Sequence, residues 1–314
     1  MGRQRKRKGD PVHGWLAVDK PTDVTSTRVV GILKRLFNAQ KAGHGGTLDP
    51  LADGILPIAF GEATKTAQWA MDCDKEYVFT IEWGTSTASQ DKEGETVATS
   101  ERRPTRADIA AVLPQFIGDI QQVPPKFSAI KVAGERAYDL ARDGESFEIP
   151  SREVTVYEAE IADIPDNDHV TLRVVSGKGF YVRAMARDLA QALEAEGHVS
   201  QLRRTRVGAL DESKALTLAQ LEALVDDKDA LTETLQPLEA VLDDVPMIEI
   251  DTSEAAALKQ GREIVLLPHL VEQWRNETDS DPDNRLALTR TDGTAIALGE
   301  VRAGRFQPKK VFQI

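Results

Sequence analysis

The sequence predicts an α/β protein in which a large mixed domain is followed by a small β-rich domain. Helical and strand-like patterns alternate along the first 245 residues, and short strand-like runs separated by turns prevail after Pro246. A chain of 314 residues is long enough for two domains with sizeable cores. Alternating strands that are separated by turns suit antiparallel pairing.

Helices of the first domain are predicted by apolar stripes or by capping residues. They cover residues 24–37, 105–116, 183–196 and the segment that begins at Thr217. Thr105 with Asp108, and Thr217 with Gln220, have the spacing of a capping box. Gly197 is expected to cap the C-terminus of the third helix.

Strands are predicted where β-branched and aromatic residues cluster between turns. In the first domain the strands are 77–83 and 170–175, with turns at 91–94 and 177–179. After Pro246 they are 264–267, 285–289, 294–298 and 310–312, with a helix over 253–260 that ends at Gly261. The polar, acidic stretch 276–283 is expected to be a mobile loop.

The composition is that of an ordinary globular protein and excludes several kinds of site. Hydrophobic residues make up 41% of the chain and charged residues 29%. No apolar run approaches the ~20 residues of a membrane helix, and the basic N-terminus lacks the apolar stretch of a secretory signal. The single cysteine, Cys73, excludes an internal disulfide, and the histidines show no metal-ligand spacing. We therefore expect no metal site and a reducing, cytoplasmic setting.

The net charge of −12 is unevenly distributed, which matters for a nucleic-acid partner. Residues 211–314 hold 11 Lys and Arg against 21 Asp and Glu. Basic residues cluster within 3–8 and 203–206, and a nucleic-acid site needs a local positive surface rather than a basic protein. Residues 1–12 are predicted to be a basic disordered tail, either solubilising or in contact with phosphates. The cluster within 203–206 is predicted to contact nucleic acid.

The most informative stretch is Gly-His-Gly-Gly-Thr-Leu-Asp-Pro at 43–50. Gly45 and Gly46 allow backbone conformations closed to other residues, and Pro50 biases Asp49 away from helical geometry. A short carboxylate held out on a bent loop is one way to present a nucleophile. From these residues alone, Asp49 can equally be an ordinary turn residue. A phosphate-binding glycine loop is disfavoured, because the Lys that follows the last glycine of that motif is absent.

Six blocks of the sequence, in the same order, resemble the bacterial tRNA pseudouridine-55 synthases of TruB type. The first block runs from GWLAVDKP at 14–21 through the loop at 43–54, and the others are GEATK at 61–65, DKEY at 74–77, PPKFSA at 124–129, GKGFYVR at 177–183 and LRRT at 202–205. The resemblance covers about residues 13 to 210. Gly45 stands where many members carry Thr, and Asp23 where many carry Gly, but neither removes a group that the reaction needs.

The resemblance implies the fold, the reaction and the partner. It implies an α/β (α+β) pseudouridine synthase catalytic domain over 13–245 with a mixed, mainly antiparallel sheet, an RNA-gripping insertion at 124–150, and a PUA-like β-rich domain over 246–314. Members are isomerases that convert uridine to pseudouridine at position 55 in the T-loop of tRNA, by base flipping and a catalytic aspartate, without cofactor or metal. The implied partner is the T-arm of tRNA, and a monomer is the default oligomeric state.

The resemblance also implies roles for individual residues. Asp49 corresponds to the catalytic aspartate, Arg183 to the active-site arginine that can keep it ionised, and Tyr77 to the tyrosine that stacks on the flipped base. Substrate binding is assigned to His44, Tyr77, Tyr181 and Leu202, and the candidates for phosphate contact are Lys20 and Lys65. Ordinary alternatives are core packing for Tyr77 and Leu202, a turn for His44, and solvated surface for the two lysines.

Two further functions stay open at this stage. The chain can be mainly an RNA-binding or tRNA-folding factor, or it can be a pseudouridine synthase that acts on another RNA. Asp49 argues against a pure binding protein, because a carboxylate near phosphates repels them. Segment 124–150 interleaves basic residues with Phe127 and Tyr138, a composition that suits RNA. Alternatively, residues 137–142 form a short surface helix that binds nothing.

Overall fold

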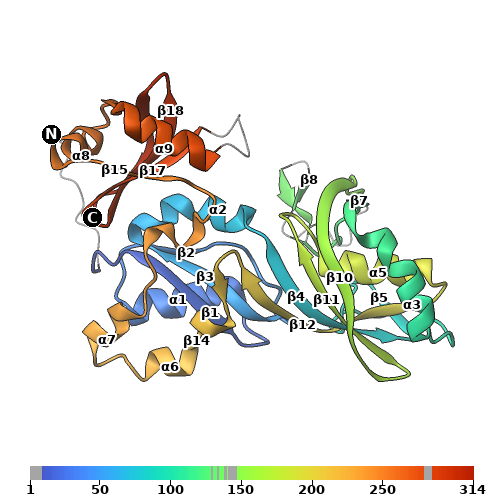
Figure 1. Cartoon of the computed structure of the whole chain (residues 1–314). Coiled ribbons are helices and arrows are strands. Elements are labelled where there is room, and N and C mark those ends of the chain that lie inside the picture. The colour runs from blue at the N-terminus through green and yellow to red at the C-terminus, as the bar shows by residue number, and fades with distance from the viewer. Residues whose placement is uncertain (1–8, 129, 133, 138–139, 141–146, 279–284) are drawn as a thin grey trace.

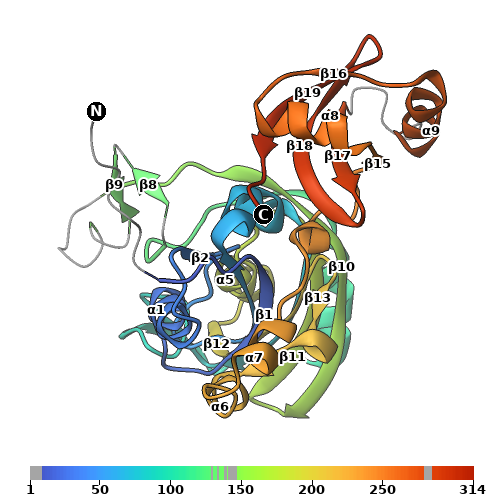
Figure 2. The ribbon, with the colours of Figure 1, turned by 90° about the vertical axis from the view of Figure 1, so that its left-hand side faces the viewer.

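The computed structural model describes residues 9–128, 130–132, 134–137, 140, 147–278 and 285–314. A long, curved sheet forms the body of the molecule, and a smaller sheet lies over one of its ends (Figures 1 and 2). The predicted α/β class and the presence of a β-rich C-terminal domain are thereby confirmed.

The large sheet has ten strands and is mainly antiparallel, as predicted. Eight strands form a path in the order β14 (Leu216–Thr217), β1 (Gly14–Lys20), β3 (Asp53–Phe60), β12 (Gly197–Val207), β4 (Lys75–Trp83), β11 (His169–Ser176), β10 (Arg152–Asp166) and β7 (Gly118–Gln122). β2 (Ala42–His44) adds to β3, and β13 (Leu210–Asp211) adds to β12. The pairs β1–β14 and β3–β12 are parallel, and the other pairs described in this sheet are antiparallel.

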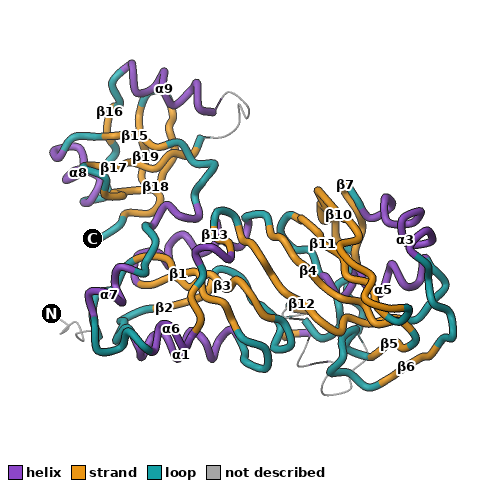
Figure 3. Tube along the Cα trace, turned by 60° about the horizontal axis from the view of Figure 1, so that its bottom comes forward, coloured by secondary structure: helices purple, strands orange, loops and turns teal. Residues whose placement is uncertain are grey.

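Helices cover both ends of this sheet (Figure 3). They are α1 (Ser26–Leu36), α2 (Ala67–Asp72), α6 (Leu218–Glu222) and α7 (Lys228–Glu233) at one end, and α3 (Arg106–Val112) and α5 (Val182–Ala192) at the other, with 3-10 turns η1 (Gly61–Thr66), η2 (Leu113–Phe116), η3 (Glu212–Lys214) and η4 (Leu238–Val241). Two small ribbons are β5 (Thr85–Thr87) with β6 (Thr96–Thr99), and β8 (Lys131–Val132) with β9 (Glu135–Arg136). The predicted strands 77–83 and 170–175 are confirmed as parts of β4 and β11.

Capping residues set the start of α1. The Thr25 side chain accepts a hydrogen bond from the Arg28 amide, so the helix begins at Ser26, slightly later than predicted. Val29 and Leu33 are buried in the core, in agreement with the predicted apolar stripe. The capping boxes predicted for the helices now labelled α3 and α6 are both present.

The predicted end of the helix over 183–196 is wrong. α5 stops earlier because Glu194 adopts a left-handed φ of 54°, and the amide of Ala195 bonds back to the last turn at 2.9 Å. This bond is part of a Schellman-type turn at the C-terminus of α5, which here forms without a glycine. Gly197 instead opens β12, where an added Cβ would lie 2.9 Å from an aromatic ring of β4.

The smaller sheet and two helices form the C-terminal domain. The strands lie in the order β15 (Met247–Glu249), β17 (Leu286–Thr291), β18 (Thr294–Arg302), β19 (Arg305–Val311) and β16 (Ile264–Val265), accompanied by α8 (Thr252–Lys259) and α9 (Pro268–Thr278). The strands and the helix predicted after Pro246 are found, with shifted bounds. The expected loop at 276–283 is wrong over 276–278, which extend α9, and 279–283 lie outside the described residues.

The two domains share one hydrophobic cluster. Trp15 and Ile55 of β1 and β3 are fully buried and belong to the same cluster as Leu298 and Phe312 of the C-terminal domain. Figure 1 shows the C-terminal domain above the end of the sheet that contains β1 and β3. The junction is therefore apolar and includes side chains from the central strands of the large domain.

Two sequence predictions lie partly outside the described residues. Of the predicted tail 1–12, residues 9–12 are not disordered, because Asp10 exchanges backbone hydrogen bonds with Asn38 and Gln40. Within 124–150, the β8–β9 hairpin stands away from the body in Figure 2. Tyr138 and most of the alternative helix over 137–142 lie outside the described residues.

Candidate active site

The loop that carries Asp49 is fastened to the helix that precedes it. The Ser26 hydroxyl donates to the Leu48 carbonyl and accepts from the Leu48 amide, each at 2.9 Å. Gly45 lies so close to Ala70 that an added Cβ would approach the Ala70 Cβ to 2.5 Å. The backbone is therefore fixed on the N-terminal side of Asp49, whose side chain stays 33% exposed.

Asp49 forms an ion pair with Arg183, as expected. The Nη2 atom of Arg183 lies 2.8 Å from Asp49 Oδ2, and Nη1 lies 3.3 Å from Asp91 Oδ2. The guanidinium also donates to the carbonyls of Ser89 and Phe127, both at 2.9 Å. The side chains of Arg183 and Asp91 are only 5% and 4% exposed. A buried cation thus bridges one buried and one partly exposed carboxylate, which holds Asp49 in a fixed orientation.

A pocket of about 330 Å³ opens beside this ion pair. Tyr77 from β4, Tyr181 at the N-cap of α5 and Leu202 from β12 line it together with Asp49 and Arg183. The fold therefore brings five of the predicted site residues to one place, from segments far apart in the sequence.

Aromatic faces form one wall of the pocket. The ring centroids of Tyr77 and Phe180 lie 6.2 Å apart, and the Arg152 guanidinium lies 4.9 Å from the centroid of the Tyr181 ring. Burial raises the pKa of the Tyr77 hydroxyl, while the positive charge of Arg204 acts in the opposite direction. Tyr77 is therefore neutral at physiological pH, and the wall suits a flat, uncharged ring.

The prediction that Lys20 contacts phosphate is wrong, because this side chain is fully buried. Its ammonium donates to the carbonyls of Pro21 and Val24, both at 2.8 Å, and to that of Pro50 at 3.2 Å. Burial lowers the pKa of Lys20 to about 8. Lys20 thus supports the segment directly after Asp49 from inside the protein.

The two other predicted residues, Lys65 and His44, do not line the pocket. Lys65 Nζ lies 2.5 Å from Glu62 Oε2 and donates to the Val311 carbonyl at 2.6 Å, which joins η1 to the C-terminal domain. His44 ends β2, and burial, followed by the charge of Arg204, lowers its pKa. The substrate contacts of these two residues stay predictions.

The predicted nucleic-acid surface at 203–206 is wrong for Arg204, which is only 2% exposed. Arg203 forms ion pairs with Asp19 at 3.1 Å and with Glu212 at 2.6 Å, and its side chain is 33% exposed. Arg206 is half-buried and donates to a backbone carbonyl at 3.4 Å. For Arg203 and Arg206, contact with nucleic acid stays a prediction.

Sequence reasoning missed four residues of the site: Asp91, Lys75, Arg152 and Arg204. Asp91 was predicted only as part of a turn, which is present, and its spacing from Arg183 gave no signal. Lys75 lines the pocket next to Tyr77, and burial lowers its pKa to about 8. Lys75 stands within the DKEY block, so its position in that block was the available signal.

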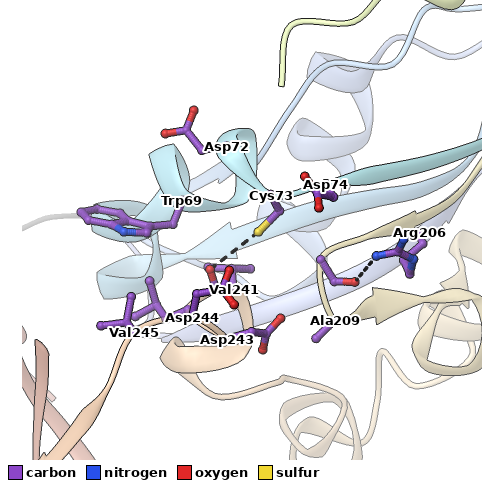
Figure 4. Close-up of a pocket in the computed structure, with 12 residues that line it drawn as sticks. Trp69, Asp72, Cys73, Asp74, Arg206, Ala209, Val241, Asp243, Asp244 and Val245 are labelled. Carbon is purple, nitrogen blue, oxygen red and sulfur yellow. Dashed lines mark hydrogen bonds between the residues drawn. The ribbon is translucent and has the colours of Figure 1, made fainter. Parts of the chain in front are cut away.

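A second hollow, of about 380 Å³, lies near the domain junction (Figure 4). Its lining includes the carboxylates of Asp72, Asp74, Asp243 and Asp244, with Cys73 and Arg206 among them. Burial raises the pKa of the Cys73 thiol, which disfavours the reactive thiolate. Carboxylates repel phosphates, so this hollow does not suit a nucleic acid.

The described residues contain no group of three or more His, Cys, Asp or Glu side chains that could hold a metal ion. No helix within the described ranges is long and apolar enough to cross a membrane.

Comparisons with known proteins agree with the geometry. Residues 34–182 match the family model described as TruB family pseudouridylate synthase (N terminal domain), and residues 183–243 match the model described as tRNA pseudouridylate synthase B C-terminal domain. A chain of the solved structure of a Cbf5–Nop10–Gar1 complex is 25% identical, with a TM-score of 0.72, and the match covers 99% of this chain and 91% of that chain.

Curated relatives match over most or all of their length. The tRNA pseudouridine synthase B of Caulobacter vibrioides is 54% identical, over 99% of this chain and 99% of the relative. The protein of the same name from Bradyrhizobium diazoefficiens is 46% identical, over 100% of this chain and 89% of the relative. The chain described here belongs to the TruB family of pseudouridylate synthases.

Proposed function

We propose that this protein isomerises the uridine at position 55, in the T-loop of tRNA, to pseudouridine, with Asp49 as its catalytic carboxylate. The family and the names of the full-length relatives support the reaction on tRNA. One observation carries the assignment of the site: a partly exposed carboxylate, held at 2.8 Å by the buried Arg183, stands at an aromatic pocket.

The reaction exchanges one bond to the ribose for another. The bond between uracil N1 and C1′ breaks, a bond between C5 and C1′ forms, the hydrogen on C5 leaves, and N1 gains a hydrogen. Loss of the base leaves C1′ electron-poor, so a carboxylate can stabilise it or attack it. The ion pair with Arg183 uses Oδ2 of Asp49, so Oδ1 is the oxygen that can face the sugar.

The aromatic pocket offsets the cost of extruding the base. Flipping a nucleotide out of folded RNA costs roughly a few kcal/mol. Stacking of the base on one aromatic ring returns about 1–3 kcal/mol. Tyr77 supplies that ring, and Tyr181 and Leu202 complete the pocket around the base. His44 is the candidate to fill the space that the base vacates in the RNA.

We assign the T-arm as the bound portion of the substrate, and a monomer as the acting species in the cytoplasm. The insertion at 124–150 and the PUA-like C-terminal domain are the candidate RNA-holding parts, and Lys65 is a candidate for phosphate contact. Because phosphate contacts release counterions, the affinity for tRNA should fall as salt rises. An affinity that stays flat from low to moderate salt would argue against phosphate contacts.

The Asp49→Asn variant tests the proposal. Asn preserves size but not charge, so we expect tRNA binding to persist while pseudouridine formation is lost. Asp72→Asn is a matched control, because Asp72 is 37% exposed and lines the second hollow instead. Pseudouridine formed by Asp49→Asn at the wild-type rate would refute the catalytic role. Mapping of the product in several transcripts tests the choice of position 55.

A tRNA-folding role is the second candidate, and the same variant measures it. If Asp49→Asn accelerates the folding of tRNA as well as the wild type does, the binding surface has a use that does not depend on catalysis. The repulsion between Asp49 and phosphates favours the enzyme as the primary function.

A further inference from the structure

Arg204 is a buried cation to which the proposed reaction assigns no role. Its side chain is among the largest fully buried ones of the described residues. Nε donates to the Ile55 carbonyl at 2.8 Å, and the terminal nitrogens donate to the carbonyls of Thr47 at 3.4 Å and Gly46 at 3.3 Å. No described carboxylate forms an ion pair with it. Burial of an unpaired cation is costly, and burial accordingly lowers the pKa of Arg204.

The contacts of Arg204 join the catalytic loop to the centre of the sheet. Residues 46 and 47 belong to the loop that carries Asp49, and Ile55 belongs to β3. On β12, Arg204 is also the direct cross-strand neighbour of Tyr77 on β4 and of Gly54 on β3. One guanidinium therefore lies between the loop with the carboxylate and the strand with the stacking tyrosine.

Arg204 adds a second cation to the surroundings of this ion pair. Asp49, Arg183 and Asp91 form a chain of ion pairs that carries one excess negative charge. Arg204 lies within electrostatic range of Asp49. Because Arg183 is shared between two carboxylates, the positive charge of Arg204 gives Asp49 a further electrostatic partner.

Other charged groups around this centre are arranged on several elements. The described groups that interact electrostatically with Asp49 are Lys20 on β1, Tyr77 on β4, Glu93 after β5, and Arg204 on β12, in addition to Arg183 on α5. Besides Asp49, the described groups that interact with Arg204 are Tyr77, His44, Lys75 and Lys20, all of which are cationic or neutral. Burial and the charges of Asp91, Asp23 and Asp49 raise the pKa of Glu93, so this region is locally rich in negative charge.

We propose that Arg204 is a positioning residue that holds residues 46 and 47 of the catalytic loop by hydrogen bonds and places a positive charge near the carboxylate of Asp49. This inference rests on the proposed role of Asp49. It assigns to one side chain two separable contributions, a set of hydrogen bonds and a charge. Substitutions that remove one contribution or both can therefore distinguish them.

The test compares Arg204→Gln, which removes the charge, with Arg204→Lys, which keeps it but cannot reproduce the forked bonds. We expect Arg204→Gln to lower kcat near neutral pH by about 10- to 100-fold. The acid limb of its kcat profile should move to higher pH by about one unit, because an ionised carboxylate loses a nearby cation. Arg204→Lys should lower kcat through the displaced loop and leave the acid limb in place. KM for tRNA should stay near the wild-type value in both.

Arg203→Gln is the matched control, because Arg203 is the adjacent residue of β12 and pairs with Asp19 and Glu212 instead. It should leave the acid limb unchanged. Activity can be followed by the release of tritium from C5 of the substrate uridine, and folding by circular dichroism. An unshifted acid limb in folded Arg204→Gln, or equal shifts in the Gln and Lys variants, would overturn the proposal.

Two results keep the test decisive. If Arg204→Gln does not fold, the Arg204→Lys variant alone tests the proposal. A lowered kcat with the acid limb of the wild type supports it. A wild-type kcat, or a displaced acid limb, contradicts it. Asp49→Asn is assayed in parallel. If that variant is fully active, the proposed function itself has failed, which is distinct from a failure of the role of Arg204.

Discussion

Replacing Ser26 with Ala tests how far the catalytic loop depends on one hydroxyl. Ser26 is 2% exposed, Leu48 is 4% exposed, and the hydroxyl is bonded to both the amide and the carbonyl of Leu48 at 2.9 Å. Water therefore cannot replace the hydroxyl unless the loop moves. A buried polar group left without a partner costs about 1–3 kcal/mol, so two such groups predict a loss of about 2–6 kcal/mol. Asp49 is the next residue, and a shift of this segment should lower kcat about tenfold or more.

Thermal unfolding and turnover of tRNA measure the two effects. The loss in stability corresponds to a decrease in Tm of roughly 3–9 °C. Ser176→Ala is the matched control, because Ser176 is fully buried and its hydroxyl has no hydrogen-bond partner within the described residues. Its removal should not lower stability, because the change eliminates a buried hydroxyl that has no hydrogen-bond partner. A Ser26→Ala protein with the Tm and kcat of the wild type, or equal losses in both variants, would refute the reasoning.

Three other substitutions have defined outcomes. Gly45→Ala places a Cβ 2.5 Å from that of Ala70, so it should destabilise the protein by about 1–3 kcal/mol, and a second change, Ala70→Gly, should restore most of this loss in chemical denaturation. Lys65→Met removes the bond to the Val311 carbonyl, so limited proteolysis should release the C-terminal domain faster, whereas unchanged cleavage would show that the apolar junction suffices. Burial lowers the pKa of Lys75 from 10.5 to about 8, so the unfolded chain binds more protons between these values and stability should rise with pH across that window. Lys75→Met should flatten that rise in Tm, and an equal rise in both proteins would contradict the assignment.

The residues that line the pocket could be identified from the sequence because the family's motifs are local. Asp49, Tyr77, Arg183 and Leu202 each stand in a short block with a fixed order along the chain. The resemblance implied the pair of Asp49 with Arg183, but the position of Leu202 beside Tyr77 could not be predicted, because it depends on the pairing of β12 with β4. The local sequence pattern of a strand does not show with which remote strand it pairs.

The central strands were not predicted because burial removes their alternation. β1 and β3 are buried along almost their whole length, on both faces, so they read as continuous apolar runs. The opposite error arose for β12, because its cluster of three arginines indicated an exposed surface and Arg204 is buried. Arg204 is inside because distant carbonyls, those of Ile55 and Gly46, are brought to its guanidinium by the fold.

Lys20, like Arg204, was wrongly assigned to the surface, because the fold brings carbonyl groups to its buried charge. Charged side chains are almost always exposed, so the sequence favoured a surface position for its ammonium. Carbonyls from Pro21, Val24 and Pro50 surround it in the structure. The prediction that the helix ends at Gly197 is wrong, because Glu194 adopts the left-handed conformation that glycine usually supplies.

The shared apolar cluster at the junction has a consequence for synthesis on the ribosome. Trp15 and Ile55 emerge early, and their partners Leu298 and Phe312 are translated almost a full chain length later. Until then, a hydrophobic face of the first strands has no cover and is available to chaperones or to other nascent chains. A chain stalled on the ribosome shortly before Leu298 should therefore have an assembled catalytic pocket beside an exposed hydrophobic surface. Such chains should bind more chaperone than chains stalled after Phe312.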